Sequence, residues 1–358
     1  MKKYNSSRLG AETAHATVSR FVMGCLCLSF LVLSGTSVLA QQGKTRKQAQ
    51  ARKNRPLDEQ VQRKGVTIWS DGTRMLGDLY LPKELKKDER LPTIVFIAGT
   101  GGTKKGFPQK LGTLFAMAGY AFLAFDYRGW GESDSKLQML DPMPEPGKDG
   151  MVTVTARAIR WQMDFSDQVA DIRNAIAFVS GEPHVDSSRI GILGTSYGGG
   201  LTVYVAAHDP RVKASAAQVP GMGGGRGPKA VYRAYVQQTQ RSRAEAEPVP
   251  YKTGAPGGKM SSYAHMRYNT AKGIGYSAIE AAELIKTPML IIDAGSEELM
   301  DITKNGGLVA KILKKNGVDV TYHIYPDIAH YGIYRERLVD ATKMEIEFFD
   351  KHLKTKKD

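Results

Sequence analysis

The chain has 358 residues, a formal net charge of +14 and only two cysteines, Cys25 and Cys27. Its length suffices for one large α/β domain, and two cysteines exclude a disulfide framework, so the fold must depend on a hydrophobic core. Much of the positive charge lies in residues 44–64 and 351–357. Charge in such segments usually marks a solvated surface, and it predicts no nucleic-acid site.

The first 40 residues have the pattern of an export signal. Basic residues precede an apolar run over 21–33, which is too short for a comfortable membrane span. A polar stretch then leads to the small-residue site at 38–40, which fits cleavage before Gln41. We therefore expect residues 1–40 to be a signal peptide and the mature protein to be periplasmic or secreted, with no integral membrane anchor.

Strands and helices alternate along most of the remaining chain. Residues 41–64 are polar and basic and predict a flexible leader, so the folded domain is expected over 65–358. The expected strands cover 66–69, 74–81, 93–98, 120–126, 189–193, 214–219, 289–292 and 320–325. The expected helices cover 111–119, 165–180, 201–207, 308–315 and 335–353. An Asp-Gly turn makes the first two strands a hairpin, and the later alternation predicts a mostly parallel, doubly wound sheet.

Two stretches interrupt this alternation. Residues 135–163 contain several prolines and glycines and predict a loop after the fourth strand. Residues 221–283, between the sixth and seventh strands, are too many for a plain connection. Tyrosines and arginines within them suit a lid that lines a substrate pocket. The alternative is a surface insertion without a role in the site.

The sequence Gly194-Thr195-Ser196-Tyr197-Gly198 fits the G-x-S-x-G motif of a nucleophile elbow. A strand precedes it and a helical stretch of small residues follows, which is the context that the motif requires. The turn is so tight that the positions two before and two after the serine must lack bulk. Ser196 is therefore the candidate nucleophile, and the backbone amide of Tyr197 is a candidate oxyanion donor.

A serine nucleophile needs a base, and the base needs a carboxylate to orient it. His330 follows the last expected strand in a short loop, at the sheet edge where Ser196 also lies, and is the candidate base. The carboxylate should follow the strand before the last. Glu297 is favoured there over Glu298, and Asp293 is the third choice. The order Ser, Glu, His along the chain is that of α/β hydrolases.

The second oxyanion donor is expected in the loop after the third strand, where the backbone amide of Thr100 is the best candidate. The glycine-rich run that begins there is not a phosphate-binding loop, because Phe107 stands where the lysine of that motif is required. The sequence contains no motif with metal-ligand spacing. We expect neither a metal nor a cofactor.

With these motifs the chain resembles the α/β-hydrolase superfamily, and more narrowly its dienelactone-hydrolase-like and acetyl-xylan-esterase-like serine hydrolases. Three further segments carry the resemblance. Residues 125–133 are similar to the family's D-x-R-G-x-G-x-S turn, and residues 185–192 and 329–332 are also typical of the family. The resemblance implies the same catalytic and oxyanion residues, and a role for Asp126 and Arg128 in stabilising the turn. Two departures are an Ala-Gly pair at 98–99 in place of His-Gly, and a glutamate in the usual place of the aspartate.

Together these features predict an exported, cofactor-free serine hydrolase that acts on a carboxylic ester of a small molecule. An exopeptidase or an acyltransferase on the same scaffold is the first alternative, since glutamates in the insertion could bind a charged peptide terminus. A non-catalytic binding protein that kept the fold is the second alternative, and the complete set of Ser, His and carboxylate argues against it.

Overall fold

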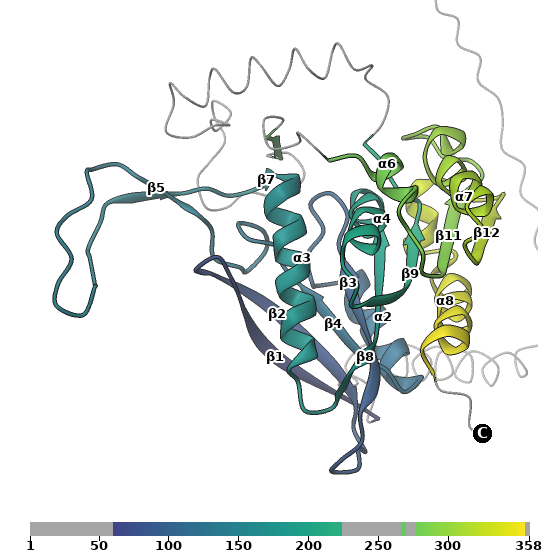
Figure 1. Cartoon of the computed structure of the whole chain (residues 1–358), viewed down its shortest axis with the longest axis horizontal. Helices are drawn as coiled ribbons and strands as arrows, with labels where there is room; N and C mark the ends of the chain where they lie inside the picture. The colour runs from purple at the N-terminus through teal and green to yellow at the C-terminus, as the bar shows by residue number, and fades with distance from the viewer. Residues whose placement is uncertain (1–59, 224–265, 270–275, 355–358) are drawn as a thin grey trace, which may run out of the picture. The chain divides into compact units, whose positions relative to one another are not determined.

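The computed structural model describes residues 60–223, 266–269 and 276–354 (Figure 1). The predicted signal peptide, nearly all of the predicted leader and most of the predicted lid lie outside these residues. An eight-stranded sheet forms the centre of the domain, in the order β1-β2-β4-β3-β8-β9-β11-β12. Its strands are β1 (Val61–Ser70), β2 (Thr73–Pro82), β3 (Leu91–Ile97), β4 (Ala121–Phe125), β8 (Val185–Thr195), β9 (Val212–Gln218), β11 (Met289–Ala294) and β12 (Val320–Tyr325).

The sheet is antiparallel at one edge and parallel elsewhere. β1 pairs antiparallel with β2, and β2 pairs antiparallel with β4. All other neighbouring strands of this sheet run parallel, as crossover connections through helices require. β3 and β4 are buried along their whole length, which explains their continuous apolar sequences. The predicted α/β-hydrolase architecture, with its N-terminal hairpin, is therefore correct.

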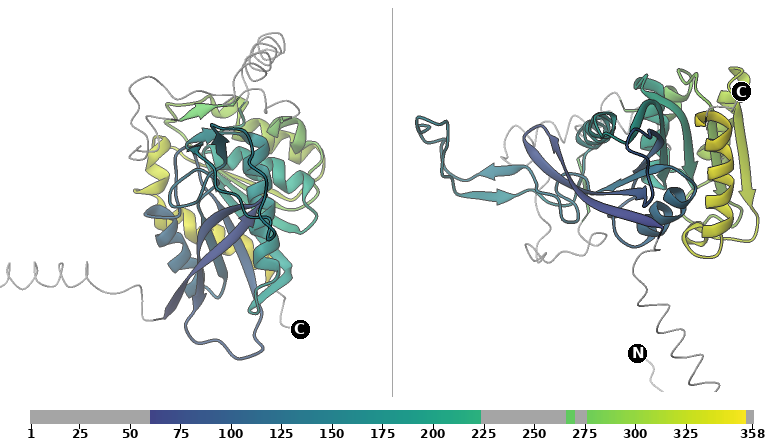
Figure 2. Two further views of the ribbon diagram at one scale, coloured as in Figure 1. Left: turned by 90° about the vertical axis from the view of Figure 1, so that its left-hand side faces the viewer. Right: turned by 90° about the horizontal axis from the view of Figure 1, so that it is seen from below.

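Helices cover both faces of the sheet. They are α2 (Phe107–Met117), α3 (Phe165–Ser180), α4 (Tyr197–His208), α6 (Ala278–Ala282), α7 (Gly306–Lys315) and α8 (Leu338–Leu353), with two short 3₁₀ turns, η2 (Ile302–Lys304) and η3 (His330–Tyr334). α3 and α4 contact each other on one face, and α2 and α8 contact each other on the other (Figures 1 and 2). Among the helices described, none has the length and hydropathy needed to cross a bilayer.

The structure departs from the expected elements in two places. β1 begins at Val61 and pairs there with Pro82, so the folded domain starts four residues before the expected boundary at 65. The expected loop over 135–163 contains three short strands, namely β5 (Leu137–Met139), β6 (Ala156–Ala158) and β7 (Gln162–Met163). β7 pairs with β10 (Arg267–Tyr268), which belongs to the insertion.

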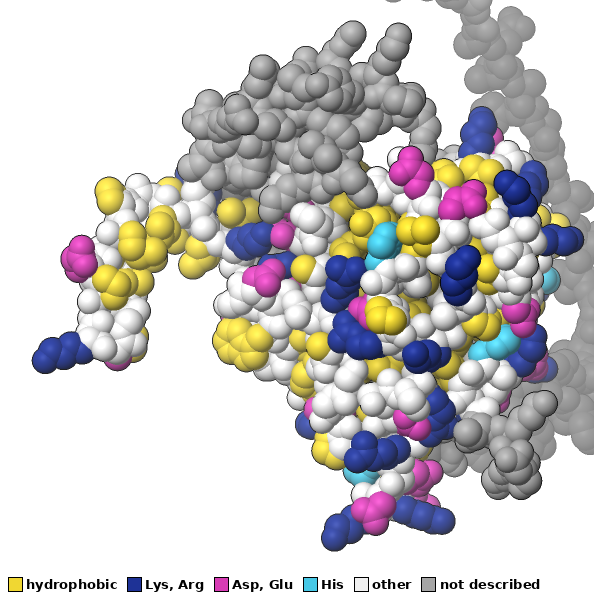
Figure 3. Space-filling view, in the orientation of Figure 1, with side chains coloured by type: hydrophobic (Ala, Val, Ile, Leu, Met, Phe, Trp, Pro, Cys, Tyr) yellow, Lys and Arg dark blue, Asp and Glu magenta, His cyan; other side chains and the backbone are white. Residues whose placement is uncertain are grey.

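β5 and β6 pair antiparallel and form an arm that extends away from the sheet (Figure 1). Hydrophobic side chains gather on this arm, at the left of Figure 3. The large exposed ones are Leu137, Met139, Leu140, Met143, Met151 and Val152. The hydrophobic core itself lies between the sheet and its helices, away from this arm.

Candidate active site

Ser196 lies between the end of β8 and the first turn of α4, in a strained backbone conformation. Its φ of 53° and ψ of −123° lie in a region that L residues rarely adopt. A Cβ on Gly194 would lie 2.3 Å from the carbonyl oxygen of Gly198, and a Cβ on Gly198 would lie 2.2 Å from that of Ile97. Both positions therefore have to be glycine, as the motif predicts.

A chain of hydrogen bonds joins Ser196, His330 and Glu297. The Nε2 atom of His330 lies 3.1 Å from Ser196 Oγ. On the other side of the ring, Nδ1 lies 2.8 Å and 3.0 Å from the two carboxylate oxygens of Glu297. Because a carboxylate can only accept here, Nδ1 carries the hydrogen and Nε2 is free to accept the proton of the serine. Both the His330 and the Glu297 side chains are buried.

The other two candidate carboxylates contact different groups. Glu298 accepts a hydrogen bond of 2.8 Å from the backbone amide of His330, and this bond holds the pKa of its carboxyl below the usual value. Asp293 accepts a hydrogen bond of 2.8 Å from the hydroxyl of Tyr322, and burial raises its pKa to about 7. Of the three, Glu297 is the one whose carboxylate reaches the imidazole ring.

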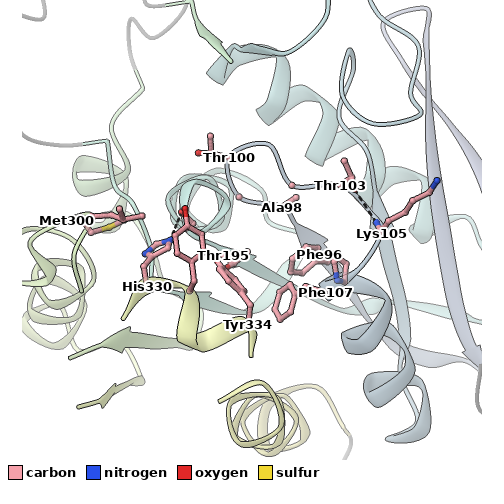
Figure 4. Close-up of a pocket in the computed structure, with 16 residues that line it drawn as sticks. Phe96, Ala98, Thr100, Thr103, Lys105, Phe107, Thr195, Met300, His330 and Tyr334 are labelled. Carbon is pink, nitrogen blue, oxygen red and sulfur yellow. Dashed lines mark hydrogen bonds between the residues drawn. The ribbon is translucent and has the colours of Figure 1, made fainter. Parts of the chain in front are cut away.

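Tyr197 and Thr100 lie beside Ser196 on two different elements. Tyr197 is the first residue of α4, so its amide is one of the free donors at a helix start. Thr100 lies in the loop that follows β3, and Figure 4 shows it above the ring of His330, across from Met300. In the described part of the chain, neither amide donates to another protein group. Both are therefore available to a substrate oxygen.

The loop that carries Thr100 is fixed by a buried lysine. The backbone amide of Lys104 donates to Asp126 at 2.6 Å. Its ammonium group lies 3.3 Å from the carboxylate of Asp78 on β2 and 2.8 Å from that of Glu132. Asp126 also accepts from the amide of Glu132, so the turn after β4 is tied to this loop, in agreement with the structural role predicted for Asp126.

The second turn residue, Arg128, also has a structural role. It is a buried side chain whose guanidinium forms an ion pair with the buried carboxylate of Asp171 on α3 and a second one with Asp71 in the β1–β2 turn. Its backbone amide donates to Asp171 as well, at 2.9 Å. These bonds fasten the turn after β4 to α3 and to the hairpin, away from Ser196.

A cavity of about 340 Å³ opens beside Ser196. Aromatic and aliphatic side chains form most of its wall, and Figure 4 shows three of them, Phe96, Phe107 and Tyr334, close together. The hydroxyl of Tyr334 is hydrogen-bonded to Thr195 at 2.8 Å, next to the nucleophile. A cavity of this size is at the lower end of the range for small-molecule sites.

Sequence analysis missed several residues that shape this site. Tyr334 lies four positions after His330, on the same 3₁₀ turn, and this spacing could have suggested it. Lys104 lies four positions after Thr100, but no local pattern shows that its ammonium group is buried. Phe107 was considered only as the residue that excludes a phosphate loop, whereas the structure places it in the wall of the cavity.

Parts of the insertion between β9 and β11 reach this site as well. Its first residue, Gly221, donates its amide to the carbonyl of Ser196 at 2.9 Å. Near its end, Tyr276 stacks on Phe165 with the ring centroids 4.1 Å apart. The rest of the predicted lid lies outside the described residues. Within the described ranges, no group of three His, Cys, Asp or Glu side chains could hold a metal ion.

Two family models match the chain and overlap in the region of Ser196. The acetyl xylan esterase (AXE1) model matches residues 62–224, and the prolyl oligopeptidase family model matches residues 158–356, which is more than half of the chain. A curated relative is the quorum-quenching protein AidA of Acinetobacter baumannii, 32% identical over 129 residues. These residues are 36% of this chain and 35% of that protein, so the alignment spans about a third of AidA.

Solved structures show the same fold at low sequence identity. The hypothetical protein PA2218 of Pseudomonas aeruginosa has a TM-score of 0.59 and 20% identity, covering 84% of this chain and 96% of its own. An acetyl xylan esterase from Paenibacillus sp. R4 has a TM-score of 0.52 and 21% identity, and the alignment covers 91% of this chain and 97% of that one. The acylaminoacyl peptidase of Pyrococcus horikoshii has a TM-score of 0.55 and 21% identity, over 84% of this chain and 43% of that one.

At these identities the structural similarities establish the fold alone, whereas the family models add the sequence pattern around the site. Esterase-like and peptidase-like hydrolases are both among the similar proteins. The chain therefore belongs to the α/β-hydrolase superfamily and, by the match over more than half of its length, to the prolyl oligopeptidase family within it.

Proposed function

We propose that this protein is a serine hydrolase that cleaves carboxylic esters of small molecules through an acyl-enzyme intermediate. Ser196 is the nucleophile, His330 the general base, and Glu297 the carboxylate that orients the imidazole. The amides of Tyr197 and Thr100 bind the oxyanion. The observation that carries the proposal is the continuous hydrogen-bonded chain from Ser196 Oγ through His330 to the buried Glu297 carboxylate.

In the first half-reaction, His330 Nε2 takes the proton of Ser196 as the oxygen attacks the ester carbonyl. The negative charge that develops on the carbonyl oxygen is stabilised by the two free amides, each worth about 3 kcal/mol of barrier in sites of this kind. The imidazolium then gives its proton to the departing alcohol. The acyl group remains on Ser196 as an ester.

In the second half-reaction, His330 takes a proton from water, which attacks the acyl-enzyme and forms a second oxyanion at the same amides. Collapse of this intermediate returns the proton to Ser196 Oγ and releases the carboxylic acid. Glu297 orients the imidazole and stabilises the imidazolium in both half-reactions. No metal or cofactor takes part in these steps.

Peptide hydrolysis is the second candidate, and the match to the prolyl oligopeptidase family favours it. An ester is preferred here because the described residues that line the cavity include no Asp or Glu side chain that could bind a free peptide amino terminus. Transfer of the acyl group to an alcohol in place of water is a variant of the same mechanism.

The experiment measures hydrolysis of ester and amide substrates by the purified wild-type protein and by its Ser196→Ala variant. We expect hydrolysis of nitrophenyl esters that is lost in Ser196→Ala, with little cleavage of aminoacyl or prolyl anilides. Faster cleavage of anilides than of esters would assign the protein to the peptidases. Ester cleavage that persists in the variant would remove Ser196 from the mechanism.

We also propose that the protein is exported and that residues 1–40 are removed, on the pattern of the N-terminal sequence. The expected result is a mature protein that begins at Gln41 in the periplasm or the culture medium, as determined by N-terminal sequencing. A full-length chain recovered from the cytoplasm alone would contradict export.

A further inference from the structure

The cavity beside Ser196 has an aromatic floor built from three separate elements. Phe96 comes from the end of β3, Phe107 from the first turn of α2, and Tyr334 from the end of η3. The ring of Phe107 meets that of Tyr334 edge-to-face at 4.9 Å between centroids, and that of Phe96 at 5.8 Å. Phe96 is buried, so this end of the cavity is closed by the core.

Few of the described side chains that line the cavity can carry a charge. Of the side chains that line it, Lys105 and His330 are those that can carry charge. The ammonium group of Lys105 is paired with Glu132, and Figure 4 shows this side chain at the far end of the cavity, directed away from His330. Among the described lining residues, the cavity therefore offers neither a free cation nor a carboxylate to a charged substrate group.

We propose that the aromatic end of this cavity, a chamber that the core closes at Phe96, binds the acyl chain of the substrate, that the chain is uncharged and apolar, and that Phe107 limits its length. The inference rests on the proposed esterase function and adds its substrate class. The blind aromatic end suits the acyl group better than the alcohol, because the acyl group stays on Ser196 until water releases it in the second half-reaction. The alcohol must leave before water attacks, so it requires an open path.

Phe107 is the wall residue best placed to set the length. It is partly buried and stands at the start of α2, whereas Phe96 belongs to the sheet core and Tyr334 is hydrogen-bonded beside the nucleophile. Removing its ring extends the chamber without altering a contact of Ser196, His330 or Glu297. Each methylene that gains or loses apolar contact changes kcat/KM by roughly tenfold or more.

The first experiment measures kcat/KM for nitrophenyl esters from acetate to decanoate with the wild-type protein, Phe107→Ala and the milder Phe107→Leu. Met117→Ala is the matched control, because Met117 is an exposed residue of the same helix that does not line the cavity. We expect the ratio of decanoate to acetate hydrolysis to rise at least about tenfold in Phe107→Ala, less in Phe107→Leu, and to stay unchanged in Met117→Ala.

The second experiment needs only the wild-type protein and tests the charge of the acyl group. It compares a butyrate ester with the hemisuccinate ester of the same alcohol, which places a carboxylate at the end of a chain of similar length. We expect the charged chain to be hydrolysed at least about tenfold more slowly, since the chamber would have to desolvate an unpaired carboxylate. Preference for the hemisuccinate would overturn the proposal.

Labelling with a fluorophosphonate separates this inference from the proposed function. If Ser196 reacts and esters are cleaved, but the length profile of the folded Phe107 variants matches the wild type, the acyl chamber is wrong and the hydrolase remains. The acyl assignment is also contradicted if the Phe107 variants change the preference for the length of the alcohol but not the preference for the length of the acyl chain. If Ser196 does not react and no ester is cleaved, both proposals fail together.

Discussion

At the scale of single residues, the two neighbouring glutamates after β11 divide the contacts of His330 between them. Glu297 places its carboxylate against Nδ1 of the ring, and its side chain is almost completely buried. Glu298 is exposed and reaches the backbone amide of His330 instead. The first contact fixes the tautomer of the His330 ring, whereas the second helps only to position the His330 backbone.

This division predicts unequal effects of matched substitutions. Glu297→Gln should lower kcat/KM by about 10³–10⁴-fold, because an amide can present a hydrogen-bond donor to Nδ1 and then favours the wrong tautomer. Glu298→Gln should lower it by less than about tenfold, since the amide oxygen of the glutamine can still accept from the backbone. Steady-state kinetics of both variants on one ester test this prediction. A larger loss of kcat/KM in Glu298→Gln than in Glu297→Gln would assign the orienting role to Glu298.

Sequence alone indicated Ser196 and His330, because Ser196 directly follows a recognisable strand and His330 follows another after a short loop. It favoured Glu297 over Glu298 but could not exclude Glu298, since adjacent residues in an irregular loop point in directions that only the loop backbone sets. The hydrogen bond from Leu299 N to the Glu297 carboxylate at 2.9 Å is part of this local geometry. No periodicity in the sequence encodes such a contact.

At the scale of elements, the oxyanion loop depends on its connection to β2 and to the turn after β4. Lys104 makes that connection through Asp78, Asp126 and Glu132. Hydrogen bonds to Lys104 and to the exposed Lys105 lower the pKa of Glu132 to about 2, so this carboxylate is charged over the whole working pH range. We therefore expect Lys104 to act as a positioning residue for the Thr100 amide.

Replacing Lys104 by methionine should lower kcat by roughly 10–100-fold with a smaller change in KM, because the loop holds the oxyanion donor more loosely in the transition state. Lys104→Arg, which keeps the charge, should restore part of kcat. Lys110→Met, at an exposed position of α2, is the control and should behave like the wild type.

The methionine variant also leaves Asp78 buried without its partner and should be less stable. The split between kcat and KM, measured below the melting temperature, separates the two effects. Equal kcat values for wild type and a folded Lys104→Met would show that the loop does not need this anchor.

The main elements were predictable where their own sequence carries the pattern. β12 and α3 begin and end where the sequence predicts, since a polar or capping residue flanks an apolar or amphipathic run. β7 and β10 were not predicted, because each is two residues long and its partner lies about a hundred positions away in the chain. A pairing at that distance leaves no local signal.

At the scale of the whole molecule, a buried glutamate lies in the core and is linked to Ser196 through Gln218. Glu345 of α8 is fully buried and accepts a hydrogen bond of 2.5 Å from the side chain of Gln218 on β9. The backbone carbonyl of Gln218 in turn accepts from the amide of Ser196 at 2.9 Å. Burial raises the pKa of Glu345 to about 8.

This burial predicts that stability falls as the pH rises. Between the ordinary pKa of 4.5 and the native value of about 8, the folded protein keeps a proton that the unfolded chain releases. The contribution of Glu345 to the free energy of unfolding is therefore complete below pH 4.5 and is lost as the pH passes 8. Asp293, with a pKa raised to about 7, acts in the same direction.

Denaturant unfolding at several pH values between 5 and 9 measures the effect. Glu345→Gln should flatten the fall in stability between pH 5 and 8, and the slope that remains below pH 7 belongs partly to Asp293. Glu347→Gln, at an exposed position of the same helix, should retain the slope of the wild type. If Glu345→Gln and Glu347→Gln give the same pH dependence, the core glutamate does not control it.

The most direct test of the central claim is mass-spectrometric mapping of the protein after reaction with a fluorophosphonate. The strained elbow and the hydrogen-bonded His330 predict a single modification on the peptide that contains Ser196, with concurrent loss of ester hydrolysis. The His330→Ala variant should react far more slowly. Modification of another serine, or full hydrolysis by a protein whose Ser196 is quantitatively labelled, would contradict the account.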